Sequence, residues 1–225
     1  MTNRRAFLYT AAGAVAGALL PSAAKSANEA PPMSAQAALK NLMDGNARFV
    51  AGRTRARASL AAVTKLASGQ HPFATVLGCA DSRVPVETVF DHDPGDIFVV
   101  RLAGNFVSEA ALGSIEYATA VLKSPLILVL GHTKCGAVKA AMDFVETGKP
   151  LPGHMDALVH PIVPAAEQAR HEHGEWWRNS VIENVRLNVR RLRTSTPILA
   201  EAAAKGEIEV AGGVYELETG RVVLV

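Results

Sequence analysis

The only two cysteines of the chain occur in short motifs with other residues that could bind or control a metal ion. The first motif is Gly-Cys-Ala-Asp-Ser-Arg at residues 78–83, and the second is Gly-His-Thr-Lys-Cys-Gly at residues 131–136. Thiolate and imidazole are preferred zinc ligands, and three protein ligands leave one position open for water. We therefore predict a catalytic zinc site, with one ion per chain, formed by Cys79, His132 and Cys135.

Each motif alone is weak evidence for metal binding. A lone cysteine after a strand is usually a small buried apolar residue, and His-x-x-Cys occurs by chance in many proteins. In an exported protein two cysteines could instead form a disulfide, because exported compartments are oxidising. The two motifs together favour metal binding, since both cysteines follow predicted buried strands and a histidine accompanies the second one.

An acidic and a basic residue follow the first cysteine. The guanidinium of Arg83 could hold the carboxylate of Asp81 beside the metal. Alternatively, Asp81 could anchor the turn through the backbone, and Arg83 could form a structural salt bridge. Because a predicted zinc ligand is so close in sequence, we interpret both as catalytic residues.

Three short apolar runs without polar alternation predict buried parallel strands. They cover residues 73–78, 97–101 and 126–131, and a helical pattern at 107–122 joins the second run to the third. This order predicts a right-handed crossover in an α/β fold. Both cysteine motifs then lie just beyond strands, where ligands of open α/β sheets usually bind.

Helical and hairpin patterns account for most of the remaining chain. Ser34 suits the N-cap of a helix at 35–50, whereas residues 53–70 give no clear pattern. Further helices are expected from Cys135 to about 147 and at 154–172, 175–194 and 197–205, with a hairpin of 208–217 and 222–225. The predicted fold class is α/β, with a central mostly parallel β-sheet flanked by helices and a C-terminal edge hairpin.

The first residues have the pattern of an export signal. Arg4 and Arg5 precede an uncharged apolar run at 8–20, which is shorter than the roughly 20 residues of a spanning helix. The paired arginines followed by Phe and Leu resemble a twin-arginine signal; an ordinary secretory signal or a membrane anchor is the alternative. We predict a signal peptide at 1–27, a linker at 28–33 and a single domain at 34–225.

Composition and charge narrow the class of protein. Apolar residues make up 49% of the 225 and charged residues 20%, which argues against a disordered or fibrous chain. Arg4, Arg5 and Lys25 lie in the predicted signal, so 23 minus 3 basic residues remain beside 21 acidic ones and give a formal charge of −1. No basic tract of the kind that follows a phosphate backbone is then left, and we expect no nucleic-acid partner.

The predicted signal implies a soluble protein in the periplasm or another exported location. The twin-arginine export machinery would be a partner in transit. Because that machinery carries folded proteins, the thiolates could bind their metal before export and reach an oxidising compartment already protected.

Taken together, the motifs closely resemble those of β-class carbonic anhydrases, whose signature pairs Cys-x-Asp-x-Arg with a downstream His-x-x-Cys. The resemblance covers nearly all of residues 34–225. It extends to residues 45–49, 94–96, 98–101, 103–105, 114–117 and 213–215. It implies a zinc lyase, a carbonate dehydratase, that reversibly hydrates CO₂ to bicarbonate and a proton.

The resemblance also implies roles for individual residues. Asp81, held by Arg83, would orient the nucleophile, and would close the site if it moved onto the metal. Gln70, Phe98 and Tyr117 stand where the plant-like group of the family has its substrate pocket, although core packing could also explain the two aromatic residues. We count Gly136, which follows the second cysteine, as a further substrate-binding residue.

One position distinguishes two groups of the family. Val76 replaces the tryptophan that is typical of the bicarbonate-regulated group, so the resemblance favours the plant-like, non-allosteric type. The family further implies a homodimer or higher homo-oligomer in which the pocket residues face the partner's zinc. Two other functions keep the same site: hydrolysis of CS₂ or COS, and a non-catalytic scaffold with Asp81 as a fourth zinc ligand.

Overall fold

The computed structural model describes residues 33–225. The predicted signal peptide and all but the last residue of the predicted linker lie outside these residues. Among the described helices, none combines the length and the apolar character needed to cross a bilayer.

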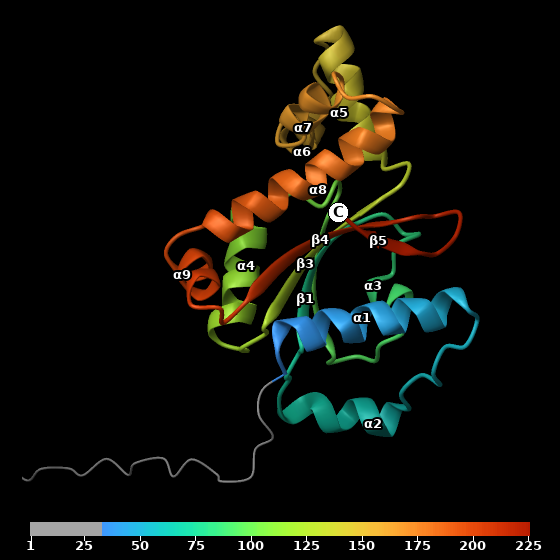
Figure 1. Cartoon of the computed structure of the whole chain (residues 1–225), viewed down its shortest axis with the longest axis vertical. Helices are drawn as coiled ribbons and strands as arrows, with labels where there is room; N and C mark the ends of the chain where they lie inside the picture. The colour runs from blue at the N-terminus through green and yellow to red at the C-terminus, as the bar shows by residue number, and fades with distance from the viewer. Residues whose placement is uncertain (1–32) are drawn as a thin grey trace, which may run out of the picture. The chain divides into compact units, whose positions relative to one another are not determined.

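A five-stranded sheet forms the centre of the fold, in the order β2-β1-β3-β4-β5 (Figure 1). The first four strands are parallel, and β5 pairs antiparallel with β4. The strands are β1 (Ala74–Cys79), β2 (Ile97–Leu102), β3 (Leu126–His132), β4 (Glu209–Tyr215) and β5 (Val222–Leu224). The predicted α/β class, the mostly parallel sheet and the C-terminal edge hairpin are confirmed.

Helices cover both faces of the sheet (Figure 1). Side chains of α1 and α3 pack against one face, and those of α4, α5, α7, α8 and α9 form the cluster on the other. The α-helices are α1 (Ala35–Val50), α2 (Leu60–Thr64), α3 (Val86–Val89), α4 (Glu109–Ala120), α5 (Gly136–Thr147), α6 (Asp156–Val159), α7 (Val163–Ala169), α8 (Trp176–Thr194) and α9 (Ile198–Ala204), with 3₁₀ turns η1 (Lys65–Ser68) and η2 (Gly153–Met155).

Alternate strand residues supply the two halves of the core. In β1, Val76 joins the cluster beneath α1, whereas Leu77 and Cys79 join the cluster beneath α8. Every residue of β1 and β3 is buried. A central strand covered on both sides needs apolar residues at every position, which explains why these runs lack polar alternation.

The single helix predicted at 154–172 is wrong. The structure divides this segment into η2, α6 and α7. Pro161 follows the end of α6 and Pro164 lies in the first turn of α7. Each proline lacks the N–H that a continuous helix would need at that point, so the helix stops and restarts. The helices predicted at 35–50 and after Cys135 are confirmed as α1, capped by the Ser34 side chain, and α5.

A buried asparagine ties α1 to two other segments. The amide nitrogen of Asn46 donates to the carbonyls of Val89, at 3.0 Å, and Gly220, at 2.9 Å. The amide oxygen of Asn46 accepts from the backbone N–H of Val222 at 2.8 Å. A helix face that packs on a sheet normally excludes such a residue, and three hydrogen bonds compensate for its burial.

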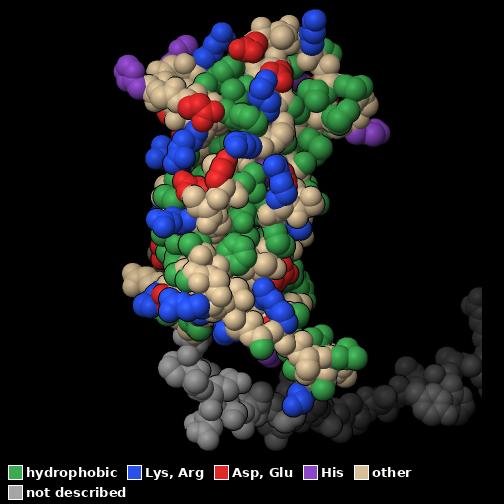
Figure 2. All heavy atoms as spheres, turned by 90° about the vertical axis from the view of Figure 1, so that its right-hand side faces the viewer, with side chains coloured by type: hydrophobic (Ala, Val, Ile, Leu, Met, Phe, Trp, Pro, Cys, Tyr) green, Lys and Arg blue, Asp and Glu red, His purple; other side chains and the backbone are tan. Residues whose placement is uncertain are grey.

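Acidic and basic side chains are interspersed on the face seen in Figure 2, with small apolar groups between them. Some exposed charges of the described residues form pairs, such as Lys40 with Asp44 and Lys205 with Glu201. Pairs of this kind contribute little to stability because water screens them.

Candidate metal centre

The three predicted zinc ligands lie together at one edge of the sheet. Cys79 ends β1, His132 ends β3 and Cys135 is the N-cap of α5. All three are buried, and their potential ligand atoms lie within 4.8 Å of one another. The parallel pairing of β1 with β3 accounts for this grouping, because it places the carboxyl ends of both strands side by side.

The spacing of the donor atoms fits a tetrahedral zinc ion. Zinc–sulfur bonds of about 2.3 Å at a tetrahedral angle require a sulfur–sulfur distance of about 3.8 Å. The Sγ atoms of Cys79 and Cys135 lie 4.0 Å apart. The bond of a disulfide is about 2.0 Å long, so the alternative pairing of the two cysteines is not formed and both are free.

The imidazole of His132 is oriented as a ligand. Its Nδ1 lies 2.9 Å from the carbonyl oxygen of Thr133 and donates to it. That bond leaves the lone pair on Nε2, which is buried and has no hydrogen-bond partner among the described residues. A buried polar atom without a partner is costly, and a metal ion bound at Nε2 would remove this cost.

Hydrogen bonding and burial act differently on the two thiols. The hydrogen bond shared with Cys135 lowers the pKa of Cys79 against the opposing effect of burial, and the Gly104 N–H lowers it further. The same bond and burial raise the pKa of Cys135. A cation between the two sulfurs would allow both to be thiolates.

Arg83 forms a bidentate contact through its guanidinium group with both carboxylate oxygens of Asp81. Its Nε lies 2.9 Å from Oδ1 and its Nη2 lies 2.7 Å from Oδ2, and its backbone N–H donates to Oδ1 at 2.9 Å. This hydrogen bonding holds the pKa of Asp81 well below its ordinary value. Oδ2 also lies 3.8 Å from Nε2 of His132, so the ionised carboxylate borders the ligand group while remaining paired with Arg83.

Arg101 supports the same turn and was not singled out from the sequence. Its Nε donates to the carbonyl of Cys79 at 2.9 Å and its Nη2 donates to the carbonyl of Asp81 at 2.6 Å. The register of β2 beside β1 places Arg101 next to Gly78. That neighbour relation depends on strand pairing, which no local pattern around Arg101 reveals.

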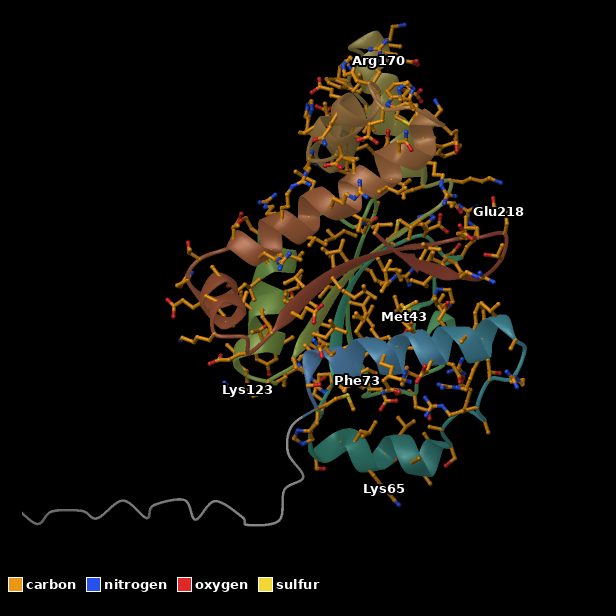
Figure 3. The ribbon with its side chains drawn as sticks, viewed as in Figure 1. Met43, Lys65, Phe73, Lys123, Arg170 and Glu218 are labelled. Atoms are coloured by element: carbon orange, nitrogen blue, oxygen red, sulfur yellow. The ribbon has the colours of Figure 1, made fainter. Side chains whose placement is uncertain are left out.

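The hairpin between β4 and β5 contacts the second ligand motif. The hydroxyl of Thr133 donates to Glu218 at 3.1 Å and accepts from the backbone of Leu217 at 3.0 Å. Lys134 pairs with Glu218 at 2.5 Å and, through that hydrogen bond, lowers the pKa of the Glu218 carboxyl. Figure 3 shows Glu218 at the turn of this hairpin. These contacts join residues 85 positions apart, which sequence spacing could not indicate.

The predicted pocket residues of the same chain lie away from this edge. Phe98 pairs with Thr75, four residues before Cys79 in β1, which corresponds to about 13 Å along the strand. The rings of Phe98 and Tyr117 lie 6.4 Å apart between centroids, and Tyr117 is 48% exposed. Gln70 is exposed ahead of β1. Only Gly136, the first residue of α5, adjoins the ligands.

Loss of any one ligand should prevent stable zinc binding. Wild type should retain about one zinc per chain after dialysis, whereas Cys79→Ser, His132→Ala and Cys135→Ser should each lose most of it, as measured by inductively coupled plasma mass spectrometry. His160→Ala, which removes a half-exposed histidine paired with Asp156, is the matched control. A His132→Ala protein that kept a full equivalent of zinc would contradict the assigned ligand set.

The sequence of this chain is similar to known proteins over most of its length. The family model described as carbonic anhydrase matches residues 74–222. Carbonic anhydrase 2 of Mycobacterium tuberculosis is 42% identical over 193 residues, which cover 84% of this chain and 91% of that protein. The carbonic anhydrase of Pseudomonas aeruginosa is 35% identical over 193 residues, with 82% and 86% covered.

Solved structures give the same relationship. The β-carbonic anhydrase of Coccomyxa, in complex with acetazolamide, shares 34% identity at a TM-score of 0.64, covering 72% of this chain and 75% of that one. A tetrameric β-carbonic anhydrase of Sordaria macrospora shares 31% identity at a TM-score of 0.65, covering 72% and 85%. The sequence match and the shared fold together show that the chain belongs to the carbonic anhydrase family, and within it to the β class.

Proposed function

We propose that the chain catalyses the reversible hydration of CO₂ to bicarbonate and a proton at a zinc ion held by Cys79, His132 and Cys135. The observation that carries this proposal is the buried group of two sulfurs and one unpartnered imidazole nitrogen directly beside an ionised Asp81. Membership of the β class supports the same reaction.

The chemistry divides between the metal and the chain. A bound zinc ion lowers the pKa of water from 15.7 toward about 7 and supplies a nucleophile near neutral pH. Asp81 would accept a hydrogen bond from the attacking water and so orient it toward the carbon of CO₂. Arg83 fixes both oxygens of Asp81, so the acceptor is already oriented before the substrate arrives.

The pairing of Asp81 with Arg83 also restricts what Asp81 can do. A carboxylate whose pKa is held well below its ordinary value is a weak base near neutral pH, because it rarely holds a proton. Asp81 therefore orients the nucleophile, and the released proton passes on to water or buffer. The same pairing favours a catalytic site over a purely structural one, in which Asp81 would serve as a fourth zinc ligand.

Two subunits complete each site. Phe98 lies beside Thr75, at the end of β1 opposite the ligands of its own chain. The exposed Tyr117 lies next to Phe98, and Gln70 precedes β1. A homo-oligomer that places these residues over a partner's metal gives each site an apolar wall and an amide donor for the substrate. Val76, which is buried in β1 where the regulated group has tryptophan, supports a pocket of the plant-like, non-allosteric type.

Removal of the charge on Asp81 should separate its role from zinc binding. Asp81→Asn should retain zinc, while kcat/KM for CO₂ hydration should fall by about 10²-fold or more in stopped-flow assays. Asp143→Asn, which alters an exposed carboxylate paired with Lys139 on α5, is the control. An Asp81→Asn enzyme with the wild-type rate would contradict the orienting role.

The dependence of the rate on pH should follow the deprotonation of the attacking water. Wild-type activity should decrease as the pH falls below about 7.5, because the attacking water must be deprotonated. Since the pKa of Asp81 is held well below its ordinary value, this decrease does not report the titration of Asp81, so Asp81→Asn should reduce the rate at every pH and still show the decrease. A flat wild-type profile between about pH 6 and pH 9 is the outcome that contradicts this expectation.

Shared sites should allow two impaired variants to restore activity together. In a hybrid dimer of Asp81→Asn and Gln70→Ala subunits, the zinc site of the Gln70→Ala subunit meets an intact Gln70 from its partner. Random reassociation should therefore return about a quarter of wild-type activity per chain, since half of the dimers are hybrid and each hybrid has one intact site. Hybrid dimers seen by native mass spectrometry without any gain in activity would contradict shared sites.

Export of the folded enzyme completes the proposal. Arg4 and Arg5, followed by an apolar run, support a twin-arginine signal and a periplasmic or other exported destination. Joint replacement Arg4→Lys and Arg5→Lys should leave the protein in the cytoplasm, as measured by cell fractionation in a bacterial host that has this pathway, whereas Lys25→Arg should not. Unchanged export of the double variant would exclude the twin-arginine route.

A further inference from the structure

The loop between β2 and α4 supplies a hydrogen bond to a zinc ligand. The backbone N–H of Gly104 donates to Sγ of Cys79 at 3.3 Å, and both groups are buried. Gly104 has a φ of +82°, and a Cβ at this position would lie 2.4 Å from Cδ1 of Ile162. Its backbone conformation and the close approach of Ile162 both require glycine, so the amide depends on the loop around it for its direction.

Two buried asparagines of α8 hold that loop at both of its ends. The amide nitrogen of Asn184 donates to the carbonyl of Gly104 at 2.8 Å. The amide oxygen of Asn188 accepts from the backbone N–H of Val107 at 2.7 Å. Asn184 is 1% exposed and Asn188 is 3% exposed, so these are interior contacts from which water is excluded.

The direction of each hydrogen bond in this network is determined. Because the N–H of Val107 can only donate, it must meet the amide oxygen of Asn188. The amide nitrogen of Asn188 then points to the side-chain oxygen of Asn184, at 3.1 Å. Asn184 is left with its amide nitrogen toward the carbonyl of Gly104, which accepts. No other orientation of the two side-chain amides satisfies all of these contacts.

Helical spacing places these residues on one face of α8. Ser180, Asn184 and Asn188 follow one another at intervals of four residues in α8. All three are buried, and α8 packs against β3 and β4. Polar groups at such positions are costly unless they are hydrogen-bonded. Leucine or alanine would serve packing alone, so the asparagines indicate a requirement for the contacts that they make with the loop.

We propose that Asn184 is a positioning residue of the zinc site, which holds the Gly104 N–H against Sγ of Cys79 and so tunes the sulfur as a ligand. This inference rests on the proposed zinc site. An N–H donor stabilises the negative charge of a thiolate and fixes the direction of its lone pairs, so its loss should make the sulfur a poorer ligand. Loss of a hydrogen bond to a metal ligand commonly changes metal affinity or activity by about 10-fold to 100-fold. Asn188 acts through Asn184 by fixing the orientation of its amide.

Two substitutions test the role of Asn184. Asn184→Ala removes the donor, and Asn184→Ser retains a hydroxyl for Asn188 but is too short to reach the carbonyl of Gly104. If Asn184→Ala fails to fold, the milder Asn184→Ser decides the question. Asn46→Ala is the matched control, because it removes an equally buried asparagine with three hydrogen bonds on the other face of the sheet.

Three measurements separate positioning from simple destabilisation. They are the sulfur-to-cobalt charge-transfer absorption of the Co²⁺-substituted protein, zinc affinity by competition with a chromophoric chelator, and kcat and KM for CO₂ hydration. Both Asn184 variants should shift the absorption band, weaken zinc binding by about tenfold and lower kcat with KM little changed. Asn46→Ala should lose stability to urea while its absorption band and zinc affinity stay as in wild type.

The outcomes distinguish this inference from the proposed function. Asn184 variants that lose stability but keep the wild-type absorption band and zinc affinity would overturn the positioning role. An Asn46→Ala protein that showed the same shift and weakening would overturn it as well. A wild type that binds cobalt and zinc through sulfur yet fails to hydrate CO₂ would instead overturn the proposed function, and the spectral comparison of Asn184 would remain valid.

Discussion

The parallel pairing of β1 with β3 is the constraint on which the site depends. It places the ends of two buried strands side by side, so that Cys79 and His132 converge although they are 53 positions apart in the chain. Cys135 reaches the same point because α5 begins there, at the end of the turn that follows β3. The buried sheet fixes the donor atoms, and the turns after each strand supply the groups that control them.

Hydrogen bonds from several parts of the fold hold those turns. Arg101 of β2 spans the carbonyls of Cys79 and Asp81, and the hairpin turn at Glu218 holds Thr133 and Lys134. Asn184 of α8 holds the loop that contains Gly104 by a hydrogen bond to the Gly104 carbonyl. Each support acts on backbone atoms or on side chains beside a ligand, which leaves the sulfurs and the imidazole free to meet a metal.

Sequence alone was sufficient for the features that depend on local pattern. Residue types and apolar runs predicted the strands, α1, α5 and the position of both cysteine motifs beyond strand ends. The single helix predicted at 154–172 is wrong because Pro161 and Pro164 interrupt the helical pattern of that segment. The roles of Arg101, Glu218 and Asn184 could not be predicted, because each follows from tertiary contacts between residues distant in the chain.

The distance of 4.0 Å between the sulfurs of Cys79 and Cys135 also makes the protein sensitive to oxidation. Without a metal, an oxidant would need to bring these atoms only to about 2 Å to close a disulfide. Such a bond would consume both thiolates and exclude zinc until a reductant reopened it. A zinc ion held by these two sulfurs would therefore protect them from oxidation, and the working lifetime of each molecule would depend on how slowly the ion departs.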